Sequence, residues 1–218
     1  VDGGIMQNIL IENITMENVN TPFFIRLGNR ARPYKAGQYV NKIEEVKDIQ
    51  LNNISVSDAK SPSSIMGLHN KKIKNISISN YTVRYTATQK SIPYNRVPFE
   101  EFSYPMANMF KNLPAYGIYC RNVEELHIQN AIVYSAENEK RPAFAFDRVD
   151  NLELFFLKAE VKDPASPMVH LRNNKNVVAS YCRSLDMNNA LFEAENNSLQ
   201  NIRLSNNFLH EGQKENAV

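Results

Sequence analysis

Seven segments of the chain share a short pattern of apolar and variable positions: apolar, any, apolar, any, usually Asn, then apolar. The copies begin at Ile9, Ile49, Ile76, Leu126, Leu152, Val177 and Ile202. Counted at the fifth position of the pattern, successive copies lie 40, 27, 50, 26, 25 and 25 residues apart. The underlying unit is therefore about 25 residues with two insertions, and a fixed period of this length predicts a stacked repeat architecture.

Alternation of apolar and polar residues predicts strands, because successive side chains on a strand point to opposite faces. In the fourth copy the expected inward set is Val123, Leu126, Ile128, Ala131 and Val133. The residues between them are polar and are expected to face solvent. Strands this short cannot bury a core alone, whereas stacked repeats can.

The alternation slips by one residue at the fifth position, which predicts a bend in each repeat. Asparagine suits such a bend because it tolerates the left-handed backbone region. The expected ladder of stacked asparagines is Asn13, Asn53, Asn80, Asn130 and Asn206. One bent coil every 25 residues predicts an all-β fold, a right-handed single-stranded parallel β-helix of about seven coils. A leucine-rich-repeat horseshoe is the rival, but its Leu-rich consensus and helical return are missing from the sequence.

Composition sets broad limits on this fold and its partners. The 218 residues form one domain, 1–218, which we interpret as the C-terminal part of a longer solenoid, and 43% of them are hydrophobic. The net charge of +2 argues against general nucleic-acid binding. The sequence contains no run of 18 apolar residues, so no membrane span is predicted. Cys120 and Cys182 lie about two coils apart, too far for a disulfide, so we expect buried free thiols.

The first insertion, 28–42, follows Arg26 and is basic and aromatic. It carries Arg30, Arg32 and Lys35 beside Tyr34, and residues 26–42 include no acidic side chain. Guanidinium groups suit carboxylates, and tyrosine rings offer flat faces for sugars. The loop therefore indicates an acidic polysaccharide as partner, the alternative being a solvated basic loop without a ligand.

The second insertion, 85–115, is rich in aromatic residues and methionine, mainly between Phe99 and Phe110. Such a composition is more typical of a flap packed on the solenoid than of a cofactor site. The neighbouring Glu100 and Glu101 form a poor acid/base pair, because adjacent residues on a strand point in opposite directions.

Several stretches resemble glycoside hydrolase family 28, the polygalacturonases and their relatives. They include residues 3–16, 63–80, 104–123 and 141–149, the last reading Arg-Pro-Ala-Phe-Ala-Phe-Asp-Arg-Val. The resemblance is most specific between residues 104 and 149. It implies a secreted or periplasmic enzyme of pectin degradation that acts on polygalacturonate or rhamnogalacturonan by inverting hydrolysis, without a cofactor.

The family's catalytic motifs, Asn-Thr-Asp, Asp-Asp, Gly-His-Gly and Arg-Ile-Lys, are missing from this sequence. In the family, the last of them falls just before a segment like Gly3–Ile5. We therefore assign no catalytic residue to this chain and expect it to supply scaffold and groove. By the same resemblance, the expected substrate-binding residues are Arg26, Asn29, Arg30 and Tyr34.

Other candidate chemistry is sparse. The four histidines lack metal-ligand spacing, so no metal site is predicted. Asp147 and Asp150 are the best carboxylate pair, but their position favours capping of a turn over catalysis. The alternatives are a non-catalytic β-helix that binds glycan or serves in assembly and, more weakly, a polysaccharide lyase. The N-terminal coil is expected to be covered by the missing N-terminal coils or by another copy of the chain.

Overall fold

The computed structural model describes residues 4–30, 32–33, 35–38, 45–195 and 201–217. Within these residues the protein is all-β, and its single helical element is the 3-10 turn η1 (Tyr94–Arg96). The longer strands are β1 (Ile9–Val19), β3 (Lys47–Ala59), β5 (Ile73–Tyr85), β6 (Ile118–Tyr134), β7 (Phe144–Phe155) and β10 (Lys175–Ser180). The shorter strands are β2 (Phe24–Arg26), β4 (Ser63–Met66), β8 (Lys158–Ala159), β9 (Val169–Arg172), β11 (Arg183–Ser184), β12 (Ala190–Ala194), β13 (Ile202–Ser205) and β14 (Lys214–Ala217).

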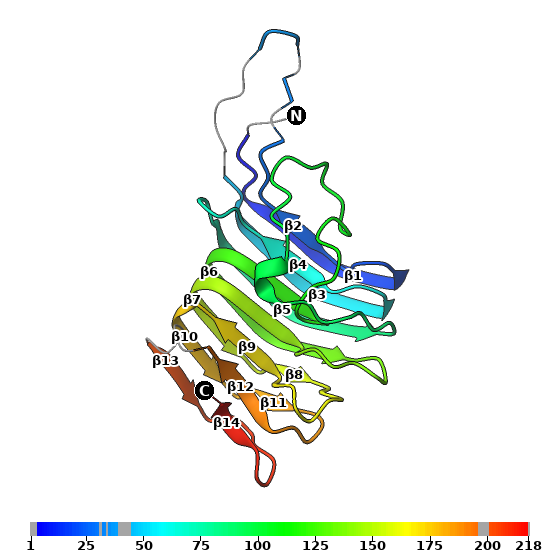
Figure 1. The fold of residues 1–218 in the computed structure, drawn as a ribbon, viewed down its shortest axis with the longest axis vertical. Helices are drawn as coiled ribbons and strands as arrows, with labels where there is room; N and C mark the ends of the chain where they lie inside the picture. Colours follow the sequence, from blue (N-terminus) through cyan, green and yellow to red (C-terminus); the bar gives the residue numbers. More distant parts are fainter. Residues whose placement is uncertain (1–3, 31, 34, 39–44, 196–200, 218) are drawn as a thin grey trace.

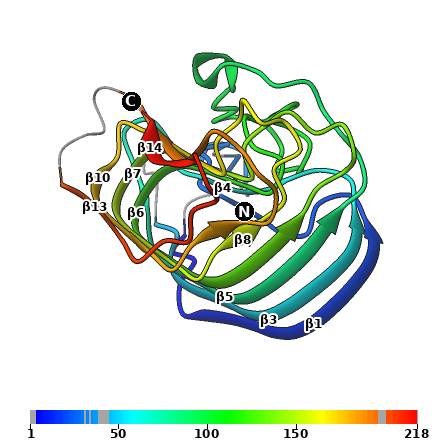
Figure 2. The ribbon, with the colours of Figure 1, turned by 90° about the horizontal axis from the view of Figure 1, so that it is seen from below.

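These strands form one parallel sheet in which each repeat pairs with the next. Its main path runs β1-β3-β5-β6-β7-β9-β12-β14, and the remaining strands pair alongside it. The register follows the sequence pattern, since Ile9 pairs with Ile49, Ile49 with Ile76, and Ile76 with Leu126. Figures 1 and 2 show β1, β3, β5 and β6 side by side as successive strands of this sheet. This many-stranded parallel sheet is compatible with the expected β-helix.

The core lies on the inner side of the sheet and contains the residues that the alternation predicted. Val123, Leu126, Ile128, Ala131 and Val133 are all buried, and they belong to one continuous apolar cluster that extends through the repeats. Each strand contributes few apolar side chains, so the stacking of repeats provides most of the buried apolar area. The prediction of a shared core is confirmed.

The bend at the fifth position is also confirmed. The five ladder asparagines have φ angles between 51° and 58°, in the left-handed region. Asn53 donates a hydrogen bond to Asn13, and Asn130 donates one to Asn80, both at 2.7 Å. The ladder is not uniform, because Asn80 donates to Asn52 instead of to Asn53. Stacked amides thus connect neighbouring repeats on the outside of the sheet.

The second insertion is a flap packed on β4 and on the first residues of β6 and β7, and packing of the flap on the repeats was predicted. Val97, Phe110 and Leu113 form a separate apolar cluster with residues of the sheet that include Met66 and Tyr119. The flap is also fixed by Arg141, whose Nη1 donates to the carbonyl oxygens of Leu113 and Ala115. It therefore covers part of the face that carries the candidate site.

Cys120 and Cys182 are free and buried, as expected. Burial raises the pKa of both thiols, that of Cys182 to about 12. A thiol must lose its proton to act as a nucleophile, so neither cysteine is a candidate for catalysis.

Candidate functional site

A column of mostly charged side chains runs across β2, β4, the first residues of β6 and β7, and β9, with one side chain from nearly every repeat. The register pairs Arg26 with Met66, Met66 with Arg121, Arg121 with Asp147, and Asp147 with Arg172. Glu195 continues it, because its carboxylate accepts a hydrogen bond of 3.0 Å from Nε of Arg172. We call Arg26, Arg121, Asp147, Arg172 and Glu195 the charged column, in which the apolar Met66 occupies the position between Arg26 and Arg121.

Arg121 attaches the middle of the column to the flap. Its guanidinium donates to the carbonyl oxygens of Val97 and Pro98, each at 2.7 Å, and lies 3.9 Å from the ring centroid of Phe99. Burial lowers the pKa of Arg121, although the neighbouring Tyr119 and Asp147 oppose this. A guanidinium held in this way positions the flap and is not accessible to a ligand.

Asp147 is fully buried between two arginines. Its carboxylate oxygens lie 3.0 Å from Arg148 and 3.3 Å from Arg172. Loss of solvent raises the pKa of Asp147, and the positive charges of Arg148, Arg172 and Arg121 oppose that shift. Asp147 and Asp150, the best carboxylate pair in the sequence, have different partners in the structure, since Asp150 forms its ion pair with Lys72. The structure therefore favours ion pairing over joint acid/base chemistry for Asp147 and Asp150.

Tyr94 connects the flap to the other end of the column. Its hydroxyl lies 2.7 Å from Nδ1 of His170, and the two rings stack with centroids 5.0 Å apart. Nε2 of His170 lies 3.5 Å from Glu193. Burial lowers the pKa of His170, opposed chiefly by Glu193. Tyr94 is half-buried and its hydroxyl is engaged with His170, so this contact fixes η1 against β9 and presents no free nucleophile.

At the opposite end, Arg26 is directed into the flap. Its Nη2 atom donates to the carbonyl oxygens of Glu100 at 2.6 Å and Glu101 at 3.0 Å, and Nη1 donates to that of Ser103 at 2.9 Å. Burial lowers its pKa, and Glu100 opposes this shift. A Cβ atom at Gly28 would lie 2.3 Å from Nη2 of Arg26, so any larger residue there would displace the guanidinium from its present position.

Asn29 and Arg30 contact the same part of the flap. The amide of Asn29 donates to the Glu101 carboxylate at 3.2 Å, and its backbone N–H donates to the Glu101 carbonyl at 2.8 Å. The guanidinium of Arg30 lies over the ring of Tyr104, 4.8 Å from its centroid. The first loop and the flap therefore meet at a junction that neither insertion forms alone.

This junction carries the most exposed aromatic side chains of the described chain. Phe102 and Tyr104 are 69% and 62% exposed, and the nearby Met106 is 50% exposed. Exposed rings beside a partly exposed arginine combine flat apolar faces with a cation. We call Asn29, Arg30, Phe102 and Tyr104 the loop–flap surface. Chemically, it is suited to a ring-shaped ligand that carries negative charge.

Three of the four residues predicted to bind substrate thus lie together. Arg26 is engaged with flap carbonyls, whereas Asn29 and Arg30 belong to the loop–flap surface. Tyr34 lies outside the described residues. Glu100 and Glu101 contribute carbonyl acceptors to the junction, and the Glu100 carboxylate also accepts a hydrogen bond from Ser103.

Sequence reasoning missed Arg121, Arg172 and their neighbours in the charged column. The signal was present, because Arg121, Asp147 and Arg172 follow one another at intervals of 26 and 25 residues, the period of the repeat. Charged residues recurring at that period must share an outward column when repeats stack in register. The sequence does single out Tyr94 as a residue of the second insertion that could reach a groove, but an insertion has no repeat that would place it beside His170.

A metal centre is not supported in the part of the chain that the structure describes, where no group of three or more His, Cys, Asp or Glu side chains could hold an ion. Among the same residues, no helix is long and apolar enough to cross a membrane. Comparison with family models, curated proteins and solved structures found no match.

Proposed function

We propose that the chain is part of a family-28-like glycoside hydrolase that acts on pectic polysaccharide, polygalacturonate or rhamnogalacturonan, by inverting hydrolysis. On this proposal the sheet is a right-handed parallel β-helix that is secreted or periplasmic. The 25-residue period, the parallel register and the left-handed bends support it. The chain supplies scaffold and groove residues to the enzyme.

The observation that carries the proposal is the pairing of Arg30 with Tyr104, with the exposed Phe102 two residues earlier in the same flap. A galacturonate unit presents a carboxylate and a C–H face. Arg30 provides a guanidinium for the carboxylate, which favours charge-assisted hydrogen bonds. Phe102 and Tyr104 provide apolar faces for the ring, and Asn29 adds an amide for hydroxyl groups.

Inverting hydrolysis needs a general acid and a general base on opposite sides of the sugar. The strongest acidic candidates of the described residues are engaged otherwise: Asp147 with two arginines, Asp150 with Lys72, and Glu139 with Arg141. The proposal therefore assigns binding, and no catalytic group, to this chain.

Binding to a galacturonate oligomer, measured by isothermal titration calorimetry, tests the proposal. We expect Arg30→Ala and Tyr104→Ala each to weaken affinity by about tenfold, the equivalent of one charge-assisted or stacking contact. The chain offers a matched control, since the guanidinium of Arg84 lies 4.4 Å from the ring centroid of Tyr134. Arg84→Ala should leave affinity unchanged. Absence of binding, or equal losses in the Arg30 and Arg84 variants, would refute the assignment.

The acidic side chains of Asp147, Asp150 and Glu139 are paired with basic residues. This pairing favours one alternative, a non-catalytic β-helix that binds glycan or serves in assembly. The two candidates differ in the residues that accompany this chain in its gene. A preceding segment with Arg-Ile-Lys and the earlier carboxylates of the family would support the hydrolase. The chain alone is expected to release no reducing ends from polygalacturonate.

We also propose that a further parallel strand docks on β1, either from preceding coils or from a second copy of the chain. β1 is at the end of the main strand path. Ile9, Ile14 and Met16 are only partly buried there, whereas Ile49 and Ile54 in the next repeat are 1% and 3% exposed. A long unpaired strand edge favours pairing with another strand. A concentration-independent monomer in sedimentation would exclude the second copy.

A further inference from the structure

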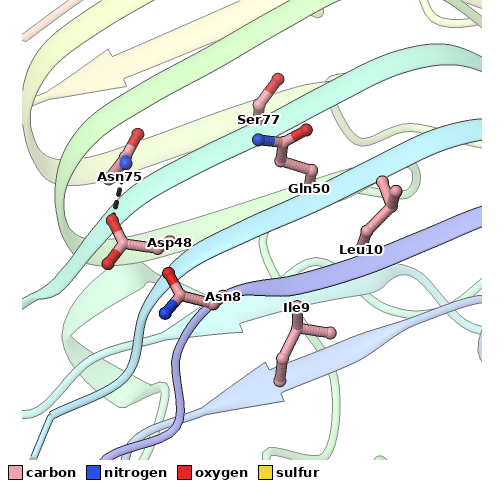
Figure 3. Close-up of a pocket in the computed structure, with 7 residues that line it drawn as sticks. All are labelled: Asn8, Ile9, Leu10, Asp48, Gln50, Asn75 and Ser77. Atoms are coloured by element: carbon pink, nitrogen blue, oxygen red, sulfur yellow. Dashed lines mark hydrogen bonds between the residues drawn. The ribbon is translucent and has the colours of Figure 1, made fainter.

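A polar hollow lies on the outer face of β1, β3 and β5, on strands other than those of the charged column (Figure 3). Its volume is about 330 Å³, at the lower end of the range for small-molecule sites. The side chains around it are those of Asn8, Leu10, Asp48, Gln50, Asn75 and Ser77, with Ile9 beside them.

The backbone holds three of these side chains at equivalent positions of successive repeats. Asn8, Asp48 and Asn75 have φ angles of 57°, 55° and 50°, so each turns the chain at the start of its strand. The amide of Asn75 donates a hydrogen bond of 2.7 Å to Oδ1 of Asp48 (Figure 3). The second oxygen of Asp48 accepts no hydrogen bond from a described residue. A carboxylate held by one oxygen leaves the other available to a ligand hydroxyl.

Leu10 is the unusual member of this group. It is apolar, yet its side chain points outward and is 57% exposed. The register aligns it with Gln50, Ser77, His127 and Glu153 in the next four repeats, all of which are polar. An apolar side chain beside amides, a hydroxyl and a carboxylate gives the hollow one apolar wall and several polar groups.

From this arrangement we infer that the hollow binds a neutral sugar unit. Sugar hydroxyls can donate to Asp48 and exchange hydrogen bonds with Gln50 and Ser77, while Leu10 contacts the C–H face of the ring. Among the described residues that line the hollow there is no lysine, arginine or histidine, and Asp48 is the one ionisable group. A uronate would place its carboxylate near Asp48, and the neighbouring Lys47 is already paired with Glu45 at 2.9 Å, so the site selects against acidic sugars.

This inference is independent of the proposed function, because it uses other residues and a ligand of opposite preference. A branched pectic polymer carries neutral side chains as well as an acidic backbone. The hollow would hold the neutral part while the loop–flap surface holds the acidic one. Failure of one site to bind leaves the other assignment intact.

Titration of the full chain, followed by backbone amide NMR shifts, tests the inference with two matched probes. Methyl β-galactopyranoside and methyl galacturonide share a ring and differ in the carboxylate. We expect the neutral probe to shift amide resonances of β3 and β5 around Gln50 and Ser77, and the acidic probe to bind there more weakly. Gln50→Ala should weaken the neutral probe by about tenfold, the loss of one to two hydrogen bonds.

Asp48→Asn is the second variant, because asparagine tolerates the left-handed backbone at this position. It should weaken the neutral probe and reduce the discrimination against galacturonide. Gln129→Ala is the control, since Gln129 is an exposed glutamine on β6 outside the hollow. The inference is wrong if neither probe shifts these resonances, if galacturonide binds as tightly as the neutral probe, or if the Gln50 and Gln129 variants behave alike.

Discussion

The aromatic rings of Phe156 and Tyr181 stack with their centroids 5.0 Å apart and their planes 8° from parallel. Both residues occupy the ladder position that asparagine holds in five other repeats, with φ angles of 56° and 58°. Bulky residues rarely adopt this region, because their side chains crowd the backbone. The stacked rings therefore offset a local backbone cost that asparagine largely avoids.

Substitutions at Tyr181 separate these two effects. Tyr181→Ala removes the stack and keeps an unfavourable left-handed residue, so we expect a loss of about 1–2 kcal/mol in the free energy of unfolding. Tyr181→Asn also removes the stack but relieves the backbone, so its loss should be clearly smaller. Urea unfolding followed by circular dichroism measures both. Equal losses would mean that the backbone conformation contributes nothing at this position.

The sequence predicted one ladder, whereas the structure has a second one five residues earlier. Its members are Asn8, Asp48, Asn75, Glu125, Asn151, Asn176 and Asn201, with φ angles from 50° to 63°. Asn176 donates to Asn151 and Asn201 donates to Asn176, at 2.9 and 3.0 Å. The mixture of Asn, Asp and Glu obscured this ladder in the sequence. Its constant offset from the first ladder was the available signal.

The insertions could be predicted only in kind. Their composition indicated a basic loop and a packed aromatic flap. The flap packs on the sheet as expected, whereas part of the loop lies outside the described residues. The contact of Arg26 with the carbonyl groups of Glu100 and Ser103 could not be anticipated. Repeats constrain residues at a fixed period, whereas a loop path depends on tertiary contacts that have no sequence period. For this reason the scaffold was predictable in detail and the junction was not.

The buried ion pair of Arg141 and Glu139 is expected to be sensitive to the loss of one partner. Their side chains are 1% and 2% exposed, with Nη2 of Arg141 2.7 Å from the carboxylate. Arg141→Met leaves the charge of Glu139 buried and uncompensated, which should cost about 3–5 kcal/mol in the free energy of unfolding. Adding Glu139→Gln should recover part of that loss. A double variant as unstable as the sum of the single variants would show that the two charges do not interact.

Asp147 should make stability depend on pH in an unusual direction. Burial raises its pKa in the folded protein, so the folded state retains this proton at pH values where the unfolded chain has released it. Stability then falls as pH rises from the ordinary Asp pKa to the raised one, and the penalty is complete above that window. Asp147→Asn removes this dependence.

Urea unfolding of both proteins across the acidic range therefore measures the contribution of Asp147 directly. The wild type should lose stability relative to the Asn variant as pH rises through the window. A relative gain would mean that Arg148 and Arg172 stabilise the carboxylate more than burial disfavours it.

Arg26 at the end of β2 and Arg30 in the first loop are four residues apart, but the structure assigns them different tasks. Arg26 donates three hydrogen bonds to carbonyl groups of the flap, whereas Arg30 contributes one cation–π contact at the surface. Removing the first set should open the flap near Phe102, since each bond contributes about 1 kcal/mol and local opening follows lost contacts. Removing the second should cost about 0.5–1 kcal/mol at most.

Limited digestion with chymotrypsin distinguishes the two arginines, because Phe102 is an exposed cleavage site within the flap. Tyr104 is exposed too, but the following Pro105 prevents cleavage there. Arg26→Ala should accelerate cleavage at Phe102 by at least about tenfold, the equivalent of about 1.4 kcal/mol in the opening equilibrium. Arg26→Lys should also be cleaved faster, since one ammonium group cannot reproduce the planar fork that reaches three carbonyls. Arg30→Ala should be cleaved nearly as slowly as the wild type while losing affinity for galacturonate. Equal cleavage of the Arg26 and Arg30 variants would show that the flap is held by its apolar cluster alone, and Arg26 would then be free to act as a ligand-binding residue.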